Sequence, residues 1–180
     1  MNLPTRRFAG IVHRAHHPGW AFDPLSGAGA KQHGGRFNRP GTEALYTALS
    51  PDTAWAEAQQ GFAFKARPVT LVSYRADIDD VLDLTDPDAL RAASANPADL
   101  ACAWADLAGR KLPAPSWLLA DRLIGEGVAG IIVPSFAAAA PPGARNLVLW
   151  RWDDEPPHRI EIIDDLGRLP RDRASWEPDR

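Results

Sequence analysis

The sequence predicts a single α+β domain (mixed α/β), with a mixed central sheet flanked by helices. Its 180 residues include 50 apolar residues other than alanine, which supply one hydrophobic core but not two. Segments with strand patterns and segments with helix patterns are interspersed without strict alternation, and no segment repeats. That order is typical of a mixed sheet rather than of a regular βαβ series.

The first third of the chain predicts two strands separated by a long loop. Residues 8–14 form a short apolar segment, which predicts a strand. Residues 16–41 are rich in Gly and Pro and lack periodicity; an ordered loop of that length usually carries function. Residues 44–49 predict a second strand. Ser50 then supplies an N-cap, followed by Pro51 and Asp52, and the predicted helix ends near Gly61.

The middle third continues with strands at residues 68–75 and 81–84. Asp86-Pro87 and Asn96-Pro97 each combine a capping side chain with a first-turn proline, so each predicts a helix start. The second of these helices ends at Gly109 and carries apolar residues at i, i+3, i+4 and i+7, which predicts one amphipathic helix: Leu100, Ala103, Trp104 and Leu107.

The last third predicts a helix over residues 116–125 and three further strands. Residues 130–133 are continuously apolar, as expected for a strand buried on both faces. Residues 146–152 and 159–163 predict the other two strands. We therefore place the domain at residues 1–164 and a solvated tail, with four Arg and four acidic residues, at residues 165–180.

Composition excludes several classes of protein. The net charge of −3 argues against a direct nucleic-acid partner, because such binding needs a basic face. No apolar segment approaches the roughly 20 residues that span a bilayer, and no leader-like segment follows the start, so we expect a cytoplasmic protein without a membrane partner. The one cysteine, Cys102, excludes an internal disulfide and a cysteine-rich zinc site.

Four standard motifs also fail. The dinucleotide fingerprint starting at Gly27 would need glycine where Gln32 stands, and the phosphate loop starting at Gly29 would need lysine where Gly35 stands. Ser135 lacks the flanking glycines of a nucleophile elbow. His16 and His17 adjoin Pro18, so they and His13 cannot use helical i, i+4 spacing, and we predict no metal site.

The segment from Gly34 to Asn38 points to chemistry. Its two glycines free the backbone, Arg36 supplies a fork of donors and Asn38 adds an amide. Tyr46 on the next strand and Glu57 on the capped helix complete a set that suits an anionic, planar ligand. The alternative is a non-catalytic binding module in which Arg36 and Glu57 form a structural ion pair.

These residues resemble those of the RES-domain family, which is named for an Arg, a Glu and a Ser. The resemblance runs in order along residues 8–163, and the naming residues would be Arg36, Glu57 and Ser135. The matching segments are His13-Arg14-Ala15, Asp23 to Gly27, Gly34 to Asn38, Leu45-Tyr46-Thr47, Ala54 to Glu57, Val133-Pro134-Ser135 and Asn146.

The resemblance implies a toxin of a bacterial type II toxin–antitoxin pair, with an Xre-type antitoxin as its partner. It implies a largely antiparallel sheet like that of ADP-ribosyltransferases, and NAD as the substrate with no metal. The enzyme would cleave the nicotinamide–ribose bond and pass ADP-ribose to a host protein, to phosphate or to water.

The resemblance also assigns roles to residues. Glu57 would stabilise the positive charge that develops on the ribose, and Arg36 would bind the diphosphate. Tyr46 would stack on nicotinamide, and Ser135 would hydrogen-bond a ribose hydroxyl or the carboxamide. These four would be catalytic residues; Arg36, Tyr46 and Ser135 would also bind NAD, together with Arg14, Gly35, Asn38 and Asn146.

Overall fold

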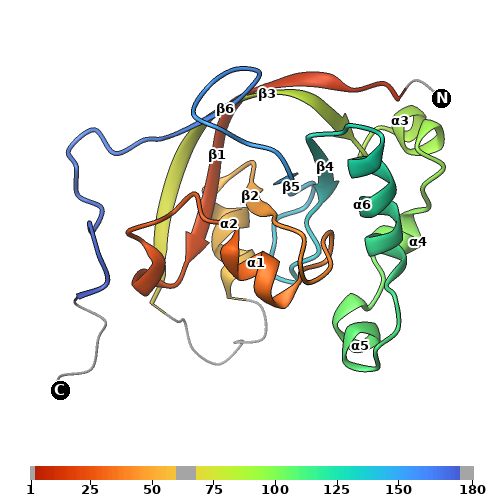
Figure 1. Cartoon of the computed structure of the whole chain (residues 1–180), viewed down its shortest axis with the longest axis horizontal. Helices are drawn as coiled ribbons and strands as arrows, with labels where there is room; N and C mark the ends of the chain where they lie inside the picture. The colour runs from red at the N-terminus through yellow and green to blue at the C-terminus, as the bar shows by residue number, and fades with distance from the viewer. Residues whose placement is uncertain (1–2, 60–67, 175–180) are drawn as a thin grey trace.

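The computed structural model describes residues 3–59 and 68–174 of the chain (Figure 1). The strands are β1 (Arg6–His16), β2 (Leu45–Ala48), β3 (Thr70–Asp83), β4 (Gly130–Pro134), β5 (Arg145–Leu149) and β6 (His158–Ile162). The helices are η1 (Pro18–Trp20), α1 (Ala28–His33), α2 (Pro51–Ala58), α3 (Pro87–Ala92), α4 (Pro97–Leu100), α5 (Trp104–Gly109) and α6 (Pro115–Gly125). The predicted helix end at Gly61 lies outside the described residues.

The six strands form one sheet that bends back on itself. The strand order is β1-β2-β5-β4-β3-β6, and β1 also pairs with β3, so the pairings of β1, β2, β5, β4 and β3 form a closed ring. Every pairing is antiparallel except β3 with β4. The predicted mixed, largely antiparallel sheet with flanking helices is confirmed.

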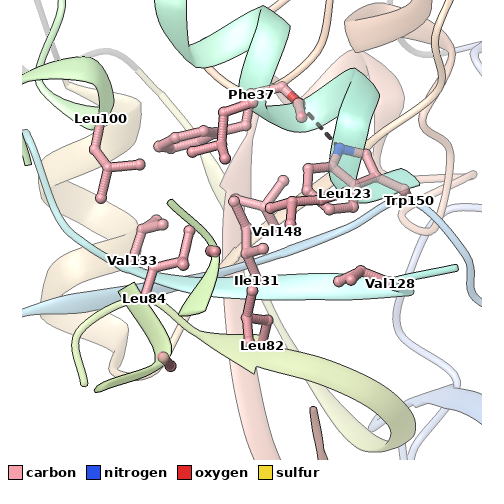
Figure 2. Packing of buried hydrophobic residues seen from close by; sticks show 14 of the residues in the cluster. Phe37, Leu82, Leu84, Leu100, Leu123, Val128, Ile131, Val133, Val148 and Trp150 are labelled. Carbon is pink, nitrogen blue, oxygen red and sulfur yellow. Dashed lines mark hydrogen bonds between the residues drawn. The ribbon is translucent and has the colours of Figure 1, made fainter. Parts of the chain in front are cut away.

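Two hydrophobic clusters lie on the two faces of the sheet. Ile131 and Val133 of β4 belong to the first and Ile132 to the second, so this strand is buried on both sides, as its apolar sequence predicts. In the first cluster, α3, α4 and α6 cover β3, β4 and β5. Phe37 and Trp150 belong to it, and Trp150 Nε1 donates to the Phe37 carbonyl at 2.9 Å (Figure 2). The second cluster takes residues from all six strands.

The helices occupy two places around the sheet. Figure 1 shows α3, α4, α5 and α6 gathered along one side, whereas α1 and α2 lie near β1 and β2. The capping predictions hold: the side chains of Ser50, Asp86 and Asn96 accept backbone N–H bonds at the starts of α2, α3 and α4. None of the described helices combines the length and apolar character that crossing a bilayer requires.

Three predictions of local structure were wrong. The two strands expected at residues 68–75 and 81–84 are one strand, β3, because β1 pairs along nearly its whole length and Arg7 bonds Asp77 across the pair. The single helix expected up to Gly109 is two, α4 and α5, because Ala103 leaves the helical conformation between them. The loop of residues 16–41 contains η1 and α1.

The segment 165–174 is less free than a solvated tail. The Asp164 carboxylate accepts the backbone N–H groups of Arg168 and Leu169, at 2.8 and 2.9 Å. The Arg173 guanidinium lies over the ring of Trp20, 4.6 Å from its centroid. The Asp164 bonds close a local turn, and the Arg173 contact places the end of this largely exposed segment beside Trp20.

Candidate active site

A cavity of about 420 Å³ opens where β1, β2, β5 and α2 meet the loop that carries Gly35. Of the eight predicted site residues, six line it: Arg14, Gly35, Arg36, Tyr46, Glu57 and Asn146. The other lining residues are His13, Ala15, Gly29, Ala30, Gly34, Thr47, Ala48, Ala54, Ala58 and Trp104. Segments far apart in sequence thus converge on one hollow.

The two arginines are anchored in the same way. Arg14 donates through Nη1 to the carbonyls of Pro24 and Ser26, at 3.1 and 2.9 Å. Arg36 donates through Nη1 to the carbonyls of Leu100 and Cys102, at 3.2 and 2.7 Å. Carbonyls fix the position of a guanidinium without neutralising its charge, so each side chain can still bind an anion.

Burial outweighs the acidic groups near both guanidiniums: Asp23 raises the pKa of Arg14 and Glu57 raises the pKa of Arg36, but the net direction is down. Burial lowers the pKa of Arg14 and of Arg36, which means that the protein makes each positive charge harder to keep. Within residues 3–59 and 68–174, neither side chain belongs to an ion pair. The Arg36 guanidinium also lies 4.4 Å from the centroid of the Phe136 ring. A polyanionic ligand would relieve this electrostatic cost.

Glu57 faces the cavity from the last turn of α2. Its Oε1 accepts two hydrogen bonds of 2.6 Å, one from Ser135 Oγ and one from Asn146 Nδ2. Ser135 follows β4 and Asn146 lies in β5, so the sheet fixes the carboxylate from behind. Ser135 does not itself line the cavity; it reaches the site through Glu57.

Tyr46 is held at its hydroxyl. The hydroxyl donates to Asn38 Oδ1 at 2.8 Å and accepts the backbone N–H of Phe37 at 2.9 Å. Burial raises the pKa of this hydroxyl, so it stays protonated at neutral pH. A Cβ at Gly35 would lie 2.5 Å from the Tyr46 oxygen, so only glycine lets the loop approach the ring this closely.

Asn38 lies behind the cavity rather than in its wall. It was expected to bind the ligand, but it is 1% exposed and does not line the cavity. Its Nδ2 donates to the carbonyls of Ala30 and Thr42, both at 2.8 Å, while its Oδ1 accepts from Tyr46. The side chain shapes the loop and holds Tyr46 in the structure.

Sequence reasoning missed the residues that hold the loop. Three successive carbonyls, of Gly35, Arg36 and Phe37, accept hydrogen bonds from side chains distant in sequence. The donors are Trp117 Nε1 at 2.7 Å, Ser116 Oγ at 2.5 Å and Trp150 Nε1 at 2.9 Å, respectively. No local motif signals these contacts, because each spans at least 80 residues.

The alternative of a structural ion pair is not what the described residues show. Arg36 directs Nη1 to the carbonyls before α5, whereas Glu57 accepts from Ser135 and Asn146. The ion pairs found between described residues do not include one between Arg36 and Glu57.

The structure is an α+β domain with a cavity that two arginines and a glutamate line. The sequence model of the RES domain matches residues 11–172, and the chain therefore belongs to the RES-domain family. No curated protein matches it. A solved structure with a similar fold is the M. tuberculosis MbcT–MbcA toxin–antitoxin complex, with a TM-score of 0.62 and 24% sequence identity, over 89% of this chain and 84% of that chain.

Proposed function

We propose that this chain cleaves the nicotinamide–ribose bond of NAD and transfers ADP-ribose to an acceptor. One observation carries the proposal: two guanidiniums that form no salt bridge among the described residues, and one hydrogen-bonded carboxylate, line the same cavity. A dinucleotide presents an anionic diphosphate and, when the bond breaks, a cationic ribose. The cavity offers a charge of the opposite sign to each.

The reaction separates charge in a defined way. As the bond between C1′ and the pyridine nitrogen breaks, its electron pair leaves with neutral nicotinamide and the ribose becomes an oxocarbenium-like cation. The Glu57 carboxylate, fixed by Ser135 and Asn146, supports the proposal because it is already oriented when that cation forms. A nucleophile then adds to C1′ and loses its proton.

Arg14 and Arg36 would bind the diphosphate. Charge-assisted bonds of this kind contribute about 1.5–3 kcal/mol each, and arginine can make two in parallel. Tyr46 would lie against the nicotinamide ring, held by the hydrogen bonds at its hydroxyl. Gly35 of the glycine-rich loop lies in the same wall of the cavity.

We further propose that the protein is the toxin of a type II toxin–antitoxin pair. The family match and the likeness to a toxin–antitoxin complex support this role, and an Xre-type protein is the partner we expect. Loss of NAD or modification of a host protein in the cytoplasm would arrest growth. The acceptor is a protein, inorganic phosphate or water, and these three differ only in what attacks C1′.

Expression of wild-type, Glu57→Ala and Glu57→Gln proteins tests the proposal. We expect wild type to arrest growth and both variants to relieve the arrest while their melting curves show folded protein. Glu126→Ala, which changes an exposed carboxylate paired with Arg122, serves as the matched control and should arrest growth like wild type. Growth arrest that persists in folded Glu57→Gln would contradict the proposal.

Purified protein with NAD identifies the acceptor. We expect free nicotinamide from wild type, in amounts that rise with added phosphate if phosphate is the acceptor. A labelled protein band in cell lysate with labelled NAD would instead identify protein modification. Intact NAD under all three conditions would refute the enzymatic proposal.

A further inference from the structure

Trp104 stands out among the residues that line the cavity. The sequence pattern predicts that it packs in the core, but neither hydrophobic cluster of the described residues contains it. Instead the side chain is half-buried and borders the cavity, where Tyr46 is the other large aromatic side chain in the wall. Packing in the hydrophobic core does not explain why an indole lies at this polar cavity, whereas a role in binding a ligand would explain it.

The turn before α5 links Trp104 to Arg36. The carbonyl of Cys102 accepts the Arg36 Nη1 bond at 2.7 Å and the backbone N–H of Trp104 at 2.8 Å. One carbonyl therefore sets the positions of the guanidinium and of the indole-bearing backbone together. The indole also packs against Trp117, with ring centroids 6.4 Å apart and an angle of 47° between the planes.

We propose that Trp104 is the stacking surface for the purine base of the dinucleotide, an inference that rests on the proposed function. Glu57 must lie at the nicotinamide-bearing ribose, and Asn146 bonds Glu57 from β5, next to the strand that carries Tyr46. The pyridine ring therefore belongs at that end. A diphosphate on Arg36 then directs the second nucleoside toward the turn that carries Trp104.

The separate halves of the substrate give the test. ADP-ribose carries the purine and the diphosphate but no pyridine, whereas nicotinamide mononucleotide carries the pyridine and no purine. We expect Trp104→Ala to raise the Kd for ADP-ribose at least about tenfold, a typical loss for one stacked base, and to change the Kd for nicotinamide mononucleotide less than about twofold. Trp104→Phe, which keeps a planar ring, should recover most of the affinity.

Calorimetric titration of both ligands measures these constants, and melting curves establish that each variant is folded. Trp55→Ala is the matched control, because Trp55 is 45% exposed and does not line the cavity; it should leave both constants unchanged. An unchanged Kd for ADP-ribose in folded Trp104→Ala, or an equal rise for both ligands, would overturn the inference and leave the proposed function standing. If wild type binds neither ligand, the proposed function fails and the inference fails with it.

Discussion

Replacement of Asn38 by alanine tests whether this residue builds the site or binds the ligand. The amide bonds the carbonyls of Ala30 and Thr42 and the hydroxyl of Tyr46, each at 2.8 Å, in a setting that is 1% exposed. Alanine would take a donor from the carbonyls of Ala30 and Thr42, of which that of Ala30 still accepts the Gly34 N–H at 2.8 Å, and would free the Tyr46 hydroxyl. We therefore expect a loss of stability in the protein without ligand.

The size of that loss follows from the bond count. Three short hydrogen bonds at about 1 kcal/mol each, with the usual spread, give a loss of about 2–4 kcal/mol. For a domain of this length, each kcal/mol lowers Tm by about 2–4 °C, so Asn38→Ala should melt about 4–16 °C below wild type. The carbonyl of Arg39, 3.3 Å from the same amide, adds little because of its length.

Thermal unfolding without NAD measures the effect, and Asn96→Ala is the control. Asn96 is an exposed N-cap that accepts one bond, from the Ala98 N–H, so its replacement should cost about 1 kcal/mol. Combining Asn38→Ala with Tyr46→Phe should cost less than the sum of the two changes, because they share a hydrogen bond. A Tm for Asn38→Ala equal to that of Asn96→Ala, or strict additivity, would refute the positioning role.

Two further predictions concern the loop and pH. Gly35→Ala should destabilise the protein by about 1–3 kcal/mol, because its Cβ would lie 2.5 Å from the Tyr46 oxygen; Gly29→Ala, with no atom near its Cβ, should be neutral in the same urea titration. Burial lowers the pKa of His16 from 6.5 to about 4. As the pH falls, His16 is therefore protonated in the unfolded chain at a higher pH than in the folded protein. The free energy of unfolding should therefore be highest above pH 6.5 and fall as the pH drops toward 4. In His16→Gln, urea titrations at a series of pH values should show a smaller fall over this range. A fall as steep as that of wild type would contradict the assignment.

The sequence predicted correctly those elements that depend on contacts between residues close together in the chain. Caps at Ser50, Asp86 and Asn96 lie where they were expected, since a capping side chain bonds an N–H only two or three residues away. The strand β4 could be predicted because burial on both faces requires an unbroken apolar segment. The break between α4 and α5 could not be predicted. The carbonyls of Leu100 and Cys102 at this break accept from Arg36, more than 60 residues earlier in the chain.

The site shows the same division between local and distant causes. The residue types at 36, 46 and 57 predicted a charged, aromatic-lined cavity, and the structure brings them together. The burial of Asn38 could not be predicted, because its position in the motif does not reveal that its partners are backbone carbonyls. Trp104 was assigned to the core because its helical spacing was read across a break between α4 and α5.

Nicotinamide release by Glu57→Gln tests the central claim most directly. Glutamine keeps the oxygen that accepts from Ser135 and Asn146, so it removes the charge with the least disturbance of the bonds around it. With NAD bound at saturation, we predict that the rate of nicotinamide release falls at least about 100-fold, while the Kd for NAD changes little. Release at the wild-type rate by folded Glu57→Gln would contradict a carboxylate that stabilises the ribose cation.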